Sequence, residues 1–132
     1  MRQSFLISFC VLIFAAVMLA ACGDSGSAPQ VVEDYLEALV AGDADRLVTL
    51  SCAEWEADAR LEADSFDAVS PTLEGGSCEV AGTEGDYTLV ACTGTISATY
   101  NGEQRQFPLD ERAYRVVFEG GEWRMCGYQE GE

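Results

Sequence analysis

Apolar and polar residues follow the period of an α-helix from residue 29 to residue 41. Pro29 suits the first turn of a helix, with Ser27 or Ala28 as its cap, and Gly42 suits its end. The pattern therefore predicts an amphipathic helix that buries one face. Its apolar stripe consists of Val32, Leu36 and Leu39, broadened by Tyr35 and Val40.

Two more helices are expected before the pattern changes. Asp43 is placed to cap a short one that ends at Ser51. Another is expected over 52–69, with Pro71 and Gly75-Gly76 ending the helical pattern. Its apolar stripe consists of Trp55, Ala59, Ala63 and Phe66. Its solvated face is expected to hold Glu54, Glu56, Asp58, Glu62, Asp64 and Asp67.

After Ser77 the pattern becomes the two-residue alternation of β-strands. Asn101-Gly102 is a strong hairpin signal, Gly94 predicts a bend or bulge, and Pro108 interrupts the strand that returns from the hairpin. Helices followed by antiparallel strands predict an α+β domain with the helices on one sheet face. The expected strands cover 77–81, 87–100, about 103–118 and 122–128.

A different segment stands in front of this domain. Phe5–Ala21 is almost wholly apolar and Arg2 is the only charge before it, which are the marks of a secretory signal. It is about 17 residues long, whereas a membrane span needs roughly 20. The closing Leu19-Ala20-Ala21-Cys22 resembles the end of a bacterial lipoprotein signal. An uncut membrane anchor and an ordinary signal peptide are the alternatives.

The lipoprotein resemblance implies that the chain is cut before Cys22 and that this residue is acylated. The chain then divides into a signal peptide over 1–21, the lipidated Cys with a flexible tether over 22–28, and a single domain over 29–130. The domain would be held on the outer side of the cytoplasmic membrane, or in the outer membrane where one is present.

Charge and composition exclude several functions. The net charge is −16, so nucleic acid would be repelled and is not expected as a partner. The chain has no His, which excludes a Ser-His-Asp triad and His-ligated zinc. Asp43 and Asp45 suggest calcium, but Leu47 and Val48 stand where an EF-hand needs an oxygen ligand and a Gly. No metal site and no cofactor are expected.

Four cysteines remain after the signal and the lipidated residue, an even number that suggests two disulfides in an exported domain. Cys78 and Cys92 would lie opposite each other in a hairpin centred near Gly85. Cys52 would then join Cys126, although three pairings are formally allowed. A metal site is a weaker alternative because no C-x-x-C pair exists, and a redox role is another.

Two segments carry a family resemblance. The run Val31-Val32-Glu33-Asp34-Tyr35-Leu36-Glu37-Ala38-Leu39-Val40-Ala41-Gly42-Asp43 and the closing Glu119-Gly120-Gly121-Glu122-Trp123-Arg124-Met125-Cys126 resemble small bacterial lipoproteins of the nuclear transport factor 2-like, or cystatin-like, superfamily. The resemblance implies N-terminal helices packed on a strongly bent antiparallel sheet of about four strands, leaving a conical cavity. One conflict stands: Trp123 and Met125 share a parity, so Cys126 would face away from Cys52. A twist or a bulge at the strand end would restore the bridge, and a different pairing is the alternative.

Arg112 and Tyr114 are the candidate cavity residues, because they share a parity with Val116 and Phe118 and would point inward. Such a pair suits an anionic or carbonyl-bearing ligand, while an Arg at the sheet margin is the plainer interpretation. No catalytic residue is assigned. The expected function is a lipid-anchored, non-catalytic envelope module that binds a small ligand or a protein. The alternative is an enzyme resembling the superfamily's isomerases and dehydratases.

Overall fold

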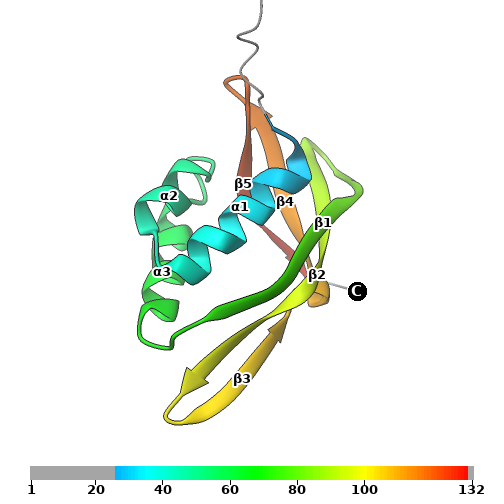
Figure 1. Ribbon diagram of the computed structural model, residues 1–132. Coiled ribbons are helices and arrows are strands. Elements are labelled where there is room, and N and C mark those ends of the chain that lie inside the picture. The colour runs from blue at the N-terminus through cyan, green and yellow to red at the C-terminus, as the bar shows by residue number, and fades with distance from the viewer. Residues whose placement is uncertain (1–25, 131–132) are drawn as a thin grey trace, which may run out of the picture.

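The computed structural model describes residues 26–130, so the predicted signal segment and Cys22 lie outside the described residues. Three helices lie on the concave side of a bent antiparallel sheet (Figure 1). The α+β architecture expected from the sequence is confirmed. The helices are α1 (Ala28–Ala41), α2 (Ala44–Thr49) and α3 (Glu56–Asp67); the strands are β1 (Thr72–Glu84), β2 (Tyr87–Tyr100), β3 (Glu103–Pro108), β4 (Arg112–Glu119) and β5 (Glu122–Glu130).

The helix ends follow the signals in the sequence. The Ser27 side chain caps α1 by accepting a hydrogen bond from the backbone N–H of Gln30 at 3.3 Å. Gly42 ends α1 in the left-handed conformation, at φ 69°. Asp43 caps α2 by accepting from the backbone N–H of Arg46 at 3.0 Å. The first two helices therefore begin and end close to where local chemistry predicts.

The third helix starts later than expected, at Glu56 and not at Cys52. The residues before it lie alongside β5. Met125 donates its backbone N–H to the carbonyl of Leu50, and Cys52 donates to the carbonyl of Met125, each at 2.8 Å. These bonds hold residues 50–52 alongside β5 in a bridge, so the contact with a distant strand delays the start of the helix.

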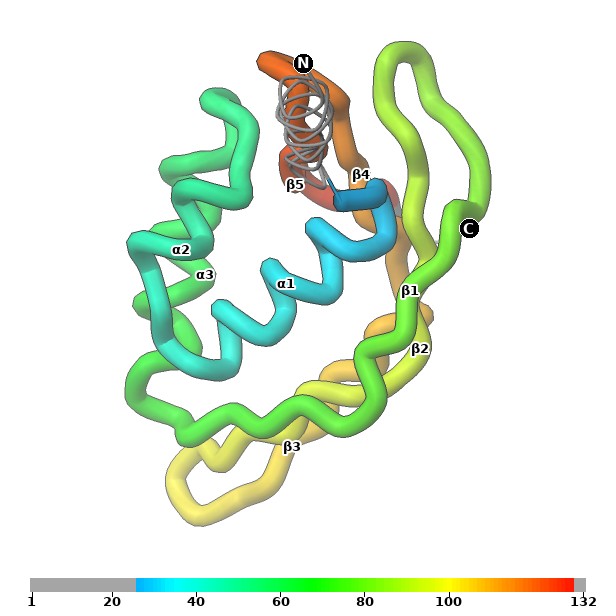
Figure 2. Tube along the Cα trace, turned by 45° about the horizontal axis from the view of Figure 1, so that its top comes forward, coloured from blue at the N-terminus to red at the C-terminus, as the bar shows by residue number. Residues whose placement is uncertain are grey.

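The sheet has five strands and not about four, because the expected return strand is split. Pro108 ends β3, and a 3₁₀ turn over Leu109–Glu111 precedes β4. Leu109 is buried in this turn. The long strand β2 pairs with β3 through 95–100 and with β4 through 88–90. β2 also pairs with β1, so it has three partners, and the sheet curves around the helices (Figure 2).

The bend in the sheet lies at a pair of glycines. β1 starts at Thr72, earlier than the expected Ser77, and its pairing with β2 shifts between Gly75 and Ser77. Gly94 opposes Gly75 with φ 127°, and a Cβ there would clash with the carbonyl of Glu74. A bulge is therefore present, but its extra residue is Gly76 of β1, which lies opposite Gly94 and not in its strand. A side chain at Gly94 is sterically excluded.

A second bulge resolves the conflict in β5. Tyr114 pairs with Tyr128 and Val116 with Met125, so two residues of β5, Cys126 and Gly127, oppose the single Arg115. The extra residue changes the parity of the strand, which lets Met125 and Tyr128 both pack in the core. A bulge at the strand end, which the sequence allowed as a way to keep the Cys52–Cys126 pairing, is therefore present.

Two disulfides join the parts of the domain, in the pairing that the sequence favoured. Cys78 and Cys92 are direct cross-strand partners in β1 and β2, with their Cα atoms 4.1 Å apart. Cys52 is bonded to Cys126, which ties the segment after α2 to the bulge of β5. The second disulfide thus reinforces the same contact that shortens α3.

Candidate functional site

A carboxylate and two tyrosines meet inside the cone, where α1, α3 and β5 face one another. Tyr35 of α1 and Tyr128 of β5 each donate a hydrogen bond to Glu62 Oε2 of α3, at 2.8 Å. Trp55 donates its Nε1–H to the Tyr35 hydroxyl at 3.1 Å. Four side chains from three parts of the chain are therefore held in one hydrogen-bonded cluster, which we call the Glu62 cluster.

The tyrosines of this cluster remain neutral donors. Burial raises the pKa of Tyr35 far above its usual value, and the negative charge of Glu62 raises it further. The pKa of Tyr128 is likewise raised, first by burial and then by Glu62. Both hydroxyls therefore keep their protons at neutral pH and hold the carboxylate in a fixed position.

Glu62 was expected on a solvated face, and that expectation was wrong. Its side chain is half-buried and points among aromatic rings. A signal was present in the sequence: Glu62 follows Trp55 by seven residues and Ala59 by three, which is the helical spacing of the apolar stripe. A carboxylate within such a stripe indicates that buried donors surround it. Tyr35 offered no comparable signal, because a tyrosine suits an apolar stripe equally well.

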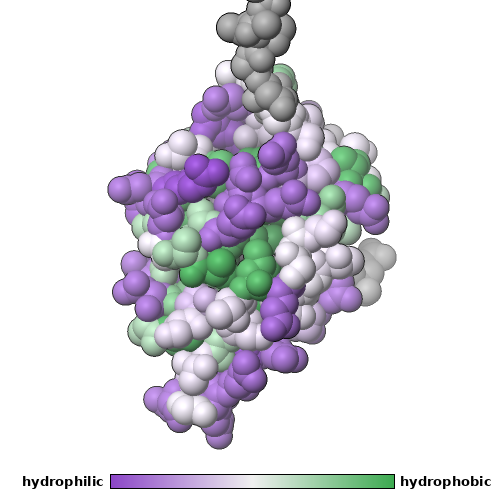
Figure 3. Space-filling view, in the orientation of Figure 1, coloured by the Kyte–Doolittle hydropathy of each residue, from purple (hydrophilic) through white to green (hydrophobic). Residues whose placement is uncertain are grey.

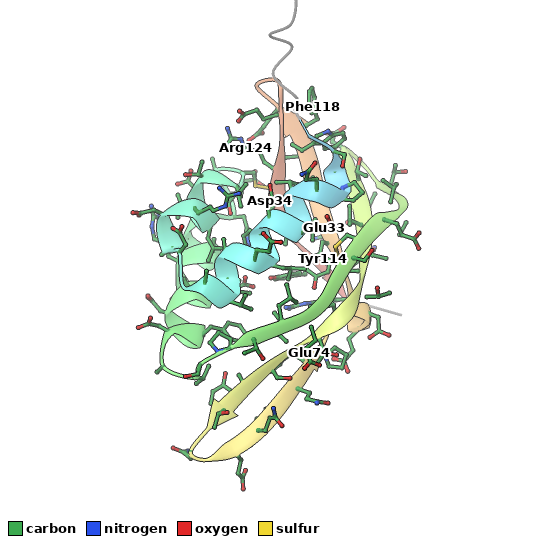
Figure 4. All side chains as sticks on the ribbon, viewed as in Figure 1. Glu33, Asp34, Glu74, Tyr114, Phe118 and Arg124 are labelled. Atoms are coloured by element: carbon green, nitrogen blue, oxygen red, sulfur yellow. A yellow bond between two sulfur atoms is a disulfide. The ribbon has the colours of Figure 1, made fainter. Side chains whose placement is uncertain are left out.

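Arg112 and Tyr114, the two residues singled out from the sequence, lie beside this cluster at one cavity. The Arg112 guanidinium stacks 3.6 Å from the centre of the Tyr128 ring, while the side chain remains exposed at its outer end. Tyr114, labelled in Figure 4, is 1% exposed. It also packs edge-on against Tyr128. Phe118, which shares their parity, does not point inward and is exposed.

The Tyr114 hydroxyl is buried and makes no hydrogen bond within the part of the chain that the structure describes. Burial raises its pKa, and the charge of Arg112 opposes that rise. Arg112 is therefore near enough to act on the hydroxyl electrostatically without bonding it in good geometry. An unpartnered hydroxyl in a core costs free energy, about 1–3 kcal/mol.

The cavity itself is small. Its volume is about 50 Å³, whereas pockets for drug-sized ligands are about 300–1,000 Å³. Phe107, Pro108 and Arg112 are exposed among its lining residues, which places its mouth between β3 and the start of β4. The space suits a few waters or the end group of a larger molecule. The remaining residues that line the cavity are Leu36, Leu39, Glu62, Phe66, Ile96, Leu109 and Tyr114.

A larger hollow of about 530 Å³ lies elsewhere, along the Cys52–Cys126 disulfide. It is lined by acids, among them Glu54, Asp86 and Glu119, and Glu84 there is paired with Arg115 at 2.6 Å. Polar residues also cover most of the face seen in Figure 3. The acidic lining of this hollow agrees with the net charge of −16, and we assign no reaction to it.

Acidic side chains are numerous but do not converge on a metal site. Over residues 26–130, no group of three Cys, Asp or Glu side chains comes together in a way that would hold a metal ion. The Asp43 side chain serves as a helix cap. Among the same described residues, no helix combines the length and apolar character needed to cross a membrane.

The fold is that of a nuclear transport factor 2-like cone. The chain is similar to Aln2 from a Streptomyces species, with a TM-score of 0.52 and 16% identity over 76% of this chain and 85% of that one. It is also similar to RPA3114, a SEC-C motif-containing protein from Rhodopseudomonas palustris, with a TM-score of 0.52 and 14% identity over 84% and 89%. No family model and no curated protein matches the chain. At these identities the likeness concerns the fold alone.

Proposed function

We propose that this protein is a lipid-anchored domain of the cell envelope whose cone binds the polar end group of a small ligand without catalysis. The anchor is supported by the apolar leader that ends in Leu19-Ala20-Ala21-Cys22. It is supported independently by the two disulfides, because paired cysteines are typical of an oxidising compartment outside the cytoplasm.

The observation that carries the binding proposal is the unpartnered hydroxyl of Tyr114. A Phe would fill the same space without the cost of burying a hydroxyl. The hydroxyl faces a cavity that Arg112 also lines. A ligand oxygen there would accept the hydrogen bond that Tyr114 lacks and would be attracted by the guanidinium. The ligand class is therefore a carboxylate or a carbonyl compound.

The size of the cavity restricts how such a ligand binds. The space of about 50 Å³ holds an end group as small as a carboxylate or a carbonyl, and not the whole of a larger ligand. The rest of the molecule would leave through the mouth and lie against Phe107, which is 38% exposed. A ligand with an apolar body and a small oxygen-bearing end group would therefore suit both the cavity and the exposed ring of Phe107.

Thermal unfolding of the full chain with a panel of aliphatic and aromatic carboxylates and ketones tests this proposal. We expect at least one member to raise the melting temperature by several degrees. Tyr114→Phe and Arg112→Leu should each reduce that rise. Tyr87→Phe is the matched control, because Tyr87 lies outside the cavity, and it should leave the rise unchanged. A panel without effect, or an equal loss in all three variants, would refute binding in the cone.

The isomerase- or dehydratase-like alternative has its own supporting observation. Such chemistry needs a carboxylate and a proton donor around one substrate, and Glu62 lies with Tyr114 on the cavity. Turnover of a ketone or hydroxy compound found by the panel, lost in Glu62→Gln, would favour this function. Binding without turnover would favour the non-catalytic one.

A further inference from the structure

We propose that Phe118 and Trp123 form a second contact with the membrane, which holds the anchored domain in one orientation. This inference rests on the lipid anchor of the proposed function. The partner is the headgroup region of a lipid surface. The contact would direct the tip of the β4–β5 hairpin toward the membrane.

The two residues form an aromatic pair near the end of that hairpin, in which Trp123 is half-buried against the core and Phe118 lies outside it. They are direct cross-strand partners, and the Glu119–Glu122 pair separates them from the Gly120-Gly121 turn. Their ring centres are 5.1 Å apart in an edge-on arrangement. Phe118 is 53% exposed, although its parity predicted an inward position. The ring thus leaves a large apolar surface in water, which is unfavourable unless something covers it.

This pair lies where the tether leaves the domain. Trp123 lines a groove together with Gly26 and Ser27, the first described residues. Phe118 is at the same end of the molecule (Figure 4). Cys22 precedes Gly26 by four residues, so even a fully extended chain separates their Cα atoms by at most about 14 Å. An acylated Cys22 would therefore keep this end of the domain close to the headgroups.

The chemistry of the pair suits the membrane interface. Tryptophan is enriched at the headgroup level of membrane proteins, where its apolar ring and its polar N–H are both satisfied. Phenylalanine contributes apolar surface at the same boundary. The neighbouring Glu119 and Glu122 are exposed, and Arg124 pairs with Glu122 at 2.7 Å. The remaining negative charge favours a zwitterionic surface over an anionic one.

The test uses the full chain, expressed in bacteria and reconstituted into phosphatidylcholine vesicles whose acyl chains carry bromine. Bromine quenches tryptophan emission only at short range, so membrane contact is read directly. The chain has two Trp residues, and Trp55 lies within the Glu62 cluster. We expect emission to be quenched, and we expect Trp123→Phe to leave emission that bromine does not quench.

Phe118→Ser should reduce the quenching by about twofold or more, because it removes the larger apolar part of the contact. Leu61→Ser is the matched control: Leu61 is 63% exposed on α3 and its loss should leave the quenching unchanged. Replacing most of the phosphatidylcholine by phosphatidylglycerol should weaken the quenching.

Mass spectrometry of the same samples distinguishes a failure of the membrane contact from a failure of the lipid anchor. Acylated protein in which quenching is absent, or equal in Phe118→Ser and Leu61→Ser, overturns the membrane contact and leaves the anchor standing. A chain that carries no acyl group at Cys22 overturns both.

Discussion

Tyr35 and Tyr114 are fully buried tyrosines of one core, yet their hydroxyls are used differently. Tyr35 donates to Glu62 and accepts from Trp55, whereas Tyr114 bonds nothing in the described residues. The first hydroxyl is a structural part of the cone. The second is buried without a partner among the described residues, and the proposed ligand would supply one.

This difference predicts effects on stability. Tyr35→Phe should lower the free energy of unfolding by about 1–2 kcal/mol, because the indole N–H of Trp55 loses its acceptor and Glu62 loses a donor. Tyr114→Phe should leave it unchanged or raise it by up to about 1 kcal/mol. Urea unfolding of the ligand-free variants measures both. A Tyr114→Phe variant that loses as much stability as Tyr35→Phe would show that the hydroxyl already has a partner.

At the scale of elements, the position of β5 decides how the site is assembled. The bulge at Cys126 and Gly127 turns Tyr128 inward, toward Glu62. Gly127 has φ 107°, and a Cβ there would lie 3.3 Å from the Trp55 ring. The Cys52–Cys126 disulfide fixes this stretch against the segment that precedes α3. One irregularity in a strand thus brings the aromatic and acidic groups together.

The two disulfides should differ in their contribution to stability. Cys52 and Cys126 are 74 residues apart in the sequence, and Cys78 and Cys92 are 14 apart. On the chain-entropy model, replacing the first pair by Ala should lower the free energy of unfolding by about 4 kcal/mol, and replacing the second by about 3 kcal/mol. Urea unfolding of the two double variants measures the difference. A larger loss from the Cys78–Cys92 pair would contradict this account.

For the whole molecule, the sequence predicts those features that depend on neighbouring residues, such as helix ends and turns. Ser27, Gly42 and Asp43 mark helix ends, and Asn101-Gly102 marks a hairpin, because each acts on its own neighbours. The fold class follows from the order of these elements.

The remaining features depend on contacts between distant segments. The start of α3 was misplaced because Leu50 and Cys52 bond to Met125. The strand count was too low because the return strand, which Pro108 interrupts, becomes β3 and β4, which pair with different parts of β2. Glu62 was assigned to solvent because its donors come from α1 and β5, far from it in the sequence. Apart from Pro108 and the helical spacing of Glu62, no residue within these segments predicts the contacts that they make with distant parts of the chain.

The central claim is that an acidic, disulfide-bonded cone is held at a membrane surface by its first mature residue. The most direct measurement is the intact mass of the protein isolated from membranes of cells that express the full chain, compared with Cys22→Ala. We predict a chain that begins at Cys22 and carries acyl groups, while the variant lacks them and loses its attachment through lipid. A wild-type chain that retains residues 1–21, or that begins elsewhere without an acyl group, would contradict the account.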